Sequence, residues 1–151
     1  MSAEYMQNSY IVNAFFPQLA AGTAEILGTK IDVQNSTLGT FSNLTFILST
    51  AAADSGAVTF AIKESSDDST YTAISGASIT TTASTNGTYM IDVNLGGPRL
   101  RYYKVSVTPA TNVTTRILNC VCVGSNPALG VNGATETLRA TNAGLVARAV
   151  V

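Results

Sequence analysis

Apolar and polar residues alternate with period two along most of this chain, and that pattern is typical of β-strands rather than helices. In the run VTFAIK, Val58, Phe60 and Ile62 share one face, whereas Thr59 and Lys63 lie on the other. Similar runs, rich in β-branched and aromatic residues, occupy residues 44–48, 89–95, 102–107 and 117–123. Earlier strands are expected around Tyr10–Phe16, Ala24–Val33 and Phe41–Ser49.

Turn-forming residues separate these runs. Ser65–Ser69, Ser75-Gly76 and Gly96–Pro98 carry residues that tolerate positive φ or bond their own backbone. Asn86-Gly87 between alternating runs predicts a hairpin. We expect the run GTYMIDVNL to pair with RYYKVSV in the core, and the turn ESSDDSTY to be exposed.

Short strands at regular spacing predict an all-β sandwich or barrel. Of these we expect a single-domain antiparallel β-sandwich, jelly-roll-like, with extended N- and C-terminal arms. The sandwich domain is assigned to residues 9–124, the N-terminal arm to residues 1–8, and a C-terminal arm or docking tail to residues 125–151. The C-terminal segment contains more apolar residues than a disordered segment usually does. It therefore requires a groove, either in its own domain or in a neighbour.

The chain is poor in charge. Of its 151 residues, 46% are hydrophobic and only 11% are charged, against a usual charged share of roughly 25%. Such a surface suits a protein that is partly covered by neighbours. The net charge is -1 and the basic residues are scattered, so binding to nucleic acid is not expected. Neither a signal peptide nor an apolar run of membrane-spanning length is evident, so we expect a soluble chain that is made in a cytoplasm and does not associate with a membrane.

The residue types offer little for catalysis. The sequence has no histidine to act as a base at neutral pH. Cys120 and Cys122 project from the same face of a predicted strand, which favours two small buried side chains over a disulfide or a metal site. The acidic cluster of Glu64, Asp67 and Asp68 is typical of a solvated turn. We therefore predict that the chain is not an enzyme, with no catalytic residue, cofactor or metal.

The aromatic residues leave one alternative of a different class. Phe15, Phe16, Phe41, Phe46 and Phe60 are expected in the core. A carbohydrate-binding sandwich needs exposed aromatic platforms, for which the candidates are Tyr5, Tyr71 and Tyr102.

Two stretches resemble a family pattern. IKESSDDSTYTAISGASIT and NGTYMIDVNLGGPRLRYYKVSVTPAT are similar to small structural proteins of tailed bacteriophages, the capsid decoration or cement proteins. The resemblance covers roughly Val58 to Val123 and carries strand and turn residues without catalytic content. The two terminal segments match none of the pattern.

The resemblance implies an accessory protein on the capsid exterior of a virion. Its partner would be the major capsid protein, and it would form a homo-oligomer, with a trimer favoured over a dimer. A tail or head-fibre component is the alternative within the same class. We expect the contacts to come from the two arms, through Tyr5, Met6, Tyr10, Leu138, Leu145, Val146 and Val150.

Overall fold

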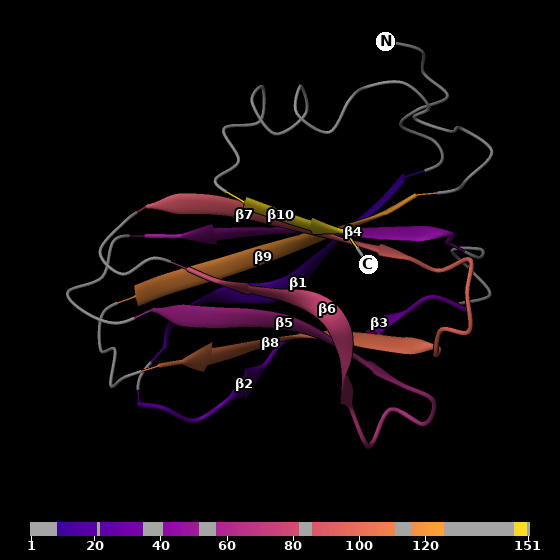
Figure 1. The fold of residues 1–151 in the computed structure, drawn as a ribbon, viewed down its shortest axis with the longest axis horizontal. Helices are drawn as coiled ribbons and strands as arrows, with labels where there is room; N and C mark the ends of the chain where they lie inside the picture. Colours follow the sequence, from indigo (N-terminus) through magenta and orange to yellow (C-terminus); the bar gives the residue numbers. More distant parts are fainter. Residues whose placement is uncertain are drawn as a thin grey trace, which may run out of the picture.

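Two β-sheets lie face to face in the computed structural model of this protein, with all described regular structure in strands (Figure 1). The structure describes residues 9–20, 22–34, 41–51, 57–81, 86–110, 116–125 and 147–150. The strands are β1 (Ser9–Ala20), β2 (Ile26–Leu27), β3 (Ile31–Asp32), β4 (Asn43–Thr50), β5 (Val58–Ser65), β6 (Thr72–Thr80), β7 (Gly87–Asn94), β8 (Tyr102–Pro109), β9 (Arg116–Ser125) and β10 (Ala147–Val150). Within this described part, no helix is long and apolar enough to cross a membrane.

Sheet A has the order β1-β9-β4-β7-β10, and sheet B has the order β2-β8-β5-β6, with β3 also paired to β8. The pairs β1·β9, β2·β8 with β3·β8, β4·β7 and β5·β6 are all antiparallel. The pairs are nested in sequence: β5·β6 is innermost, β4·β7 encloses it, β8 with β2 and β3 comes next, and β1·β9 is outermost. That arrangement is a jelly roll, so the predicted all-β, antiparallel sandwich is confirmed.

Strand β10 stands outside this nested pattern. It pairs with β7 in parallel, with Ala147 opposite Tyr89 and Val150 opposite Asp92. It also contacts β6, the edge strand of sheet B, so that it lies at the open side between the two sheets (Figure 1). The jelly roll is complete without it.

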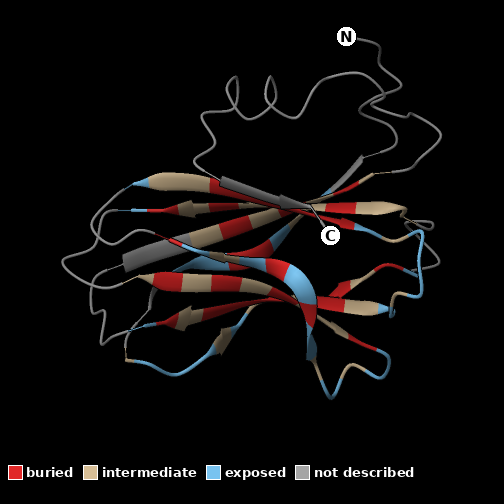
Figure 2. Cartoon of the chain, in the orientation of Figure 1, coloured by how far each residue is buried: buried red, intermediate tan, exposed pale blue. Residues whose placement is uncertain are grey.

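The core consists of alternate side chains from both sheets (Figure 2). Leu44, Phe46 and Leu48 of β4 are buried between the sheets, as the period-two pattern predicts. The Phe60 ring from sheet B and the Tyr89 ring from sheet A lie 6.4 Å apart across the core. Such aromatic pairs add to the apolar burial that stabilises the sandwich.

The cysteines fill the core at β9. Cys120 and Cys122 are free thiols, and both are buried. Because side chains alternate along a strand, Val121 and Val123 lie on the outer face instead and are only partly buried. The prediction of two small buried side chains is therefore confirmed.

Two expected strand pairings are wrong. Strand β7 pairs with β4 and β10, whereas β8 pairs with β5, β2 and β3, so the two runs lie in opposite sheets. Asn86-Gly87 likewise precedes a strand of sheet A, while β6 before it belongs to sheet B. This connection passes between sheets and is not a hairpin, because a jelly roll pairs strands that are distant in sequence.

The expected turn at Ser75-Gly76 lies inside strand β6. Gly76 has φ of 82° and sits where the β5·β6 register shifts between Ala61 and Lys63. A glycine with positive φ inside a ladder marks a bulge. The bulge bends β6 strongly (Figure 1).

Phe16 was expected in the core because of its aromatic ring, but 59% of the residue is exposed. It follows Phe15, which is buried. Two consecutive strand residues point to opposite faces, so only one of this pair can enter the core.

Most residues of the two predicted arms lie outside the described residues. Tyr5, Met6, Leu138, Leu145 and Val146 belong to that set. Strand β1 begins at Ser9 and β9 ends at Ser125. The domain boundaries at residues 8 and 124 stay predictions.

The corner between β2 and β3 should be intolerant of a methyl group. The Gly28 N–H donates to the Val105 carbonyl at 2.8 Å, and a Cβ built on Gly28 would lie 2.1 Å from the Ala14 carbonyl oxygen. Gly28→Ala must therefore push β1 away from this corner, and we expect it to lower the free energy of unfolding by about 2 kcal/mol in urea denaturation.

Gly97→Ala is the matched control, since a Cβ at Gly97 meets nothing within 4 Å. Its effect should stay within about 0.5 kcal/mol. Equal unfolding midpoints for the two variants would contradict the close approach of β1 to Gly28.

Candidate interaction surfaces

Apart from Asp92, the charged side chains that the structure describes lie on sheet B and on the loops beside it. Five ion pairs form there. We call this set the ion-pair surface: Glu25, Lys30, Asp32, Lys63, Glu64, Asp68, Arg99, Arg101 and Lys104. Its opposite charges are interleaved, so it presents no field of a single sign.

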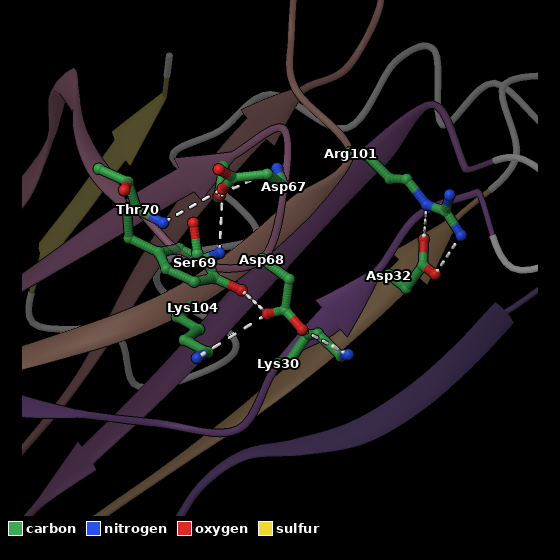
Figure 3. Close-up of polar contacts among 10 residues, drawn as sticks. Lys30, Asp32, Asp67, Asp68, Ser69, Thr70, Arg101 and Lys104 are labelled. Carbon is green, nitrogen blue, oxygen red and sulfur yellow. Dashed lines mark hydrogen bonds and ion pairs between the residues drawn. The ribbon is translucent and has the colours of Figure 1, made fainter.

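The turn between β5 and β6 is the most strongly bonded part of this surface (Figure 3). The Asp67 carboxylate accepts hydrogen bonds from the N–H groups of Ser69 and Thr70 at 2.9 and 3.2 Å, and from the Ser65 hydroxyl at 2.9 Å. Asp68 adopts φ of 60°, a left-handed conformation that Asp tolerates in turns. The predicted exposed turn is confirmed, and its carboxylates are turn caps.

Asp68 is the centre of a small charge network. Its carboxylate lies 2.6 Å from the Lys30 ammonium and 4.0 Å from the Lys104 ammonium, and it accepts a hydrogen bond from the Tyr71 hydroxyl (Figure 3). The bond from Lys30 lowers the pKa of Asp68. Arg101 and Asp32 form a two-bonded pair nearby, at 2.9 and 2.8 Å. The network ties the β5–β6 turn to β3 and β8.

The two candidate sugar platforms within the described residues carry cations over their rings. Lys104 lies 4.3 Å from the Tyr71 ring centroid. Lys30 and Arg101 lie 5.4 and 4.9 Å from the Tyr102 centroid. These are cation–π distances, so a sugar ring stacked there would have to displace ion-paired side chains. This geometry does not favour the carbohydrate-binding alternative, and Tyr5 lies outside the described residues.

The outer face of sheet A has the opposite character. Antiparallel partners share a face, so the ladder places Ile11, Val123, Thr45 and Asp92 in one row. The next row contains Asn13, Val121, Ile47 and Met90. We call these two rows, together with Phe16, the apolar face.

The one acid of the apolar face is withdrawn from solvent. Asp92 is 4% exposed, and its carboxylate accepts a hydrogen bond from the Thr45 hydroxyl at 2.5 Å. Ile11 and Phe16, in contrast, are 65% and 59% exposed. Large apolar residues that are exposed together on one face of a sheet are a candidate protein-contact surface.

Chemistry beyond binding finds no support in the described residues. No group of three or more His, Cys, Asp or Glu side chains among them could hold a metal ion. Burial raises the pKa of both the Cys120 and Cys122 thiols, which disfavours the reactive thiolate. A shallow hollow of about 490 Å³ is lined by the single loop Asn94–Arg99, without convergent polar side chains from other elements.

Of the predicted contact residues, the structure describes only the backbone of Tyr10 and Val150. Tyr10 pairs with Gly124 in β1, and Val150 pairs with Asp92 in β10. These strands lie at opposite edges of sheet A, so the structure does not bring the two residues together. Sequence reasoning missed Ile11 and Phe16. The signal was the pair Phe15-Phe16, since one of two adjacent strand aromatics must face outward.

No protein-family model matches the sequence, and no curated protein matches it. Solved structures with a similar fold include the PBSX exported protein XepA, with a TM-score of 0.60, 15% identity and 84% of this chain covered. The infectious bursal disease virus VP2 subviral particle gives a TM-score of 0.53 at 10% identity over 80% of this chain. This chain spans only 40% and 33% of those two chains. At such identities the likeness is one of fold, shared with phage and viral proteins.

The turn at Asp67 should make stability depend on pH. Hydrogen bonds from the side chain and N–H of Ser69, and then from Thr70 and Ser65, hold the pKa of Asp67 well below its usual value. Since the unfolded pKa of Asp is about 3.9, this stabilisation is present above about pH 4 and is lost as the pH falls. Urea midpoints of the wild type should fall between pH 5 and pH 3, and Asp67→Asn should reduce that fall.

The reciprocal control is Asn94→Asp. The Asn94 side-chain oxygen accepts the Gly96 N–H at 2.7 Å, and a carboxylate there would gain the same dependence. That variant should steepen the acid loss, whereas unchanged slopes in both variants would contradict the role given to these turn bonds.

Proposed function

We propose that this chain is a virion structural protein, a capsid decoration or cement protein that binds the outside of a phage head. It stabilises the lattice of the major capsid protein through protein–protein contacts. The observation that carries the proposal is the difference between the two outer faces of the sandwich. The apolar face exposes Ile11 and Phe16, whereas the five ion pairs of the described residues lie on the ion-pair surface.

A molecule with two unlike faces has a natural orientation on a larger surface. Apolar area gains free energy when another protein covers it, at roughly 25 cal/mol per Å². Interleaved charges and cation–π pairs are already satisfied in water and gain little from being covered. We therefore place the apolar face toward the capsid and the ion-pair surface toward solvent.

Such a protein acts by mass action. A ligand that binds only the expanded lattice shifts the equilibrium toward that lattice and opposes its disassembly. Oligomerisation, with a trimer favoured, would raise the effective concentration of each contact once the first is made. The low charge content of the chain suits a surface that is covered by neighbours in the assembly.

The arms remain part of the proposal. Tyr5, Met6 and Tyr10 at the N-terminal end, and Leu138, Leu145, Val146 and Val150 at the C-terminal end, would extend the contact beyond the sandwich. Tyr10 lies in β1, the strand that carries Ile11. The N-terminal arm therefore starts from the edge of the apolar face.

The direct test is cosedimentation of the purified protein with expanded capsids and with unexpanded procapsids. We expect binding to expanded capsids, and a loss of at least tenfold in affinity for the pair Ile11→Asp with Phe16→Asp. The loss arises because binding would have to desolvate two new carboxylates.

Ser78→Asp with Thr72→Asp is the matched control. Both residues are exposed on β6 of sheet B, so the variant adds the same charge away from the apolar face. It should bind like the wild type. Failure of the wild type to sediment with either particle would end the proposal, and equal losses in the two variants would remove the apolar face from it.

A further inference from the structure

Strand β7 is buried like a central strand although it lies at the edge of the jelly roll. Its five consecutive residues from Tyr89 to Val93 are all buried, on the core side and on the outer side alike. In β4, the neighbouring central strand, the outer residues are only partly buried. The edge of β7 that faces away from β4 is paired in the structure by β10, so it does not present a free row of backbone groups.

Strand β10 has the geometry of an added strand rather than of a hairpin partner. All other ladders among the described residues are antiparallel, whereas β10 is parallel to β7 over Ala147–Val150. The nested pairs of the jelly roll close without it. Strand β10 is thus a terminal strand added to the edge of β7, where it also contacts β6.

The end of β9 and the start of β10 lie at different positions along sheet A, so a short connection cannot join them. Ser125, the last residue of β9, is in register through Asn43 with Asn94, at the C-terminal end of β7. Strand β10 instead starts opposite Tyr89, five residues earlier and about 17 Å back along the strand. A β10 that comes from the same molecule must therefore be reached by a connection that returns along the length of sheet A.

Chain length allows the donor to be another molecule. Residues 126–146 separate β9 from β10, and 21 extended residues span up to about 70 Å. A domain of this size has a radius of gyration of only about 15 Å. The tether therefore reaches the β7 edge of an adjacent copy as readily as its own.

We propose that the edge of β7 beside β6 is a receptor for the C-terminal strand of a second copy of this chain. Neighbouring molecules would exchange β10 in the parallel register that pairs Arg148 with Met90. The β7·β10 ladder is the same whether β10 comes from the same molecule or from a second one. Protein concentration and packing of copies therefore decide between them, and close packing favours exchange.

Disulfide trapping between two differently tagged chains tests the exchange. One chain carries Met90→Cys and the other carries Arg148→Cys, positions that lie opposite each other in the ladder. The two are unfolded together in urea under reducing conditions, refolded at increasing concentration and then oxidised. We expect a covalent dimer of the two tags whose yield rises with protein concentration on a non-reducing gel. The native cysteines are buried in the folded chain and stay unreacted.

Three controls define the result. Ile47→Cys mixed with Met90→Cys tests the β4·β7 ladder inside the jelly roll and should give no mixed dimer. Met90→Cys with Arg148→Cys in one chain should close within the molecule at high dilution. A Met90→Cys chain that ends at residue 138 should keep its strand signal in circular dichroism. Because it lacks a β10 of its own, it should give more mixed dimer with the full-length Arg148→Cys chain than the full-length Met90→Cys chain does.

The inference is overturned if the mixed dimer never exceeds the Ile47→Cys and Met90→Cys control at any concentration. It is equally overturned if the single-chain double variant does not close, because β10 would then not pair with the edge of β7. The experiment needs no capsid. Its failure would therefore leave the proposed capsid binding standing, and loss of capsid binding would leave the strand exchange standing.

Discussion

The open hydrogen-bonding edge of a β-sheet is the constraint on which this structure depends. Each edge strand must be paired, covered or interrupted, because a free row of N–H and C=O groups recruits other strands. Strand β1 is interrupted by two register shifts and by Pro17, and its Ala14 carbonyl accepts the Thr29 N–H at 2.8 Å. Strand β6 is broken by the bulge at Gly76. The β7 edge has neither device within Gly87–Asn94, and it is the edge that receives an extra strand.

The same constraint explains which parts of the fold the sequence could predict. The facing of individual side chains follows from local alternation, so Val58, Phe60 and Ile62 were placed correctly in the core. Strand pairing in a jelly roll joins residues that are far apart in sequence, such as Leu44 with Gly124. No local pattern encodes that choice, which is why β7 and β8 were expected side by side and lie in opposite sheets. The bulge in β6 was hidden for a related reason, because a glycine followed by apolar residues fits a turn as well as a bulged strand.

The candidate surfaces were only partly predictable. The low charge content of the sequence could not indicate that the described charged side chains, apart from Asp92, lie on sheet B and its loops. That separation arises from parity: Lys63 and Lys104 occupy outward positions of sheet B, whereas Val121, Val123 and Ile47 occupy outward positions of sheet A. The sequence alone does not show whether a valine on a strand points into the core or outward, because that depends on which strands lie beside it. For the same reason the exposed positions of Ile11 and Phe16 were not predicted.

The two unlike faces and the paired β7 edge impose different requirements on an assembly. A flat apolar face can be covered by any partner of complementary shape, so its specificity is low and its contribution grows with area. A strand that docks in a fixed register, with Arg148 opposite Met90, satisfies backbone groups that only an extended segment can reach. If both proposals hold, specificity between copies comes from the edge of β7, and attachment to a larger surface comes from the apolar face. A sandwich with these two contacts on separate parts of sheet A could change its attachment partner without losing contact with its neighbours.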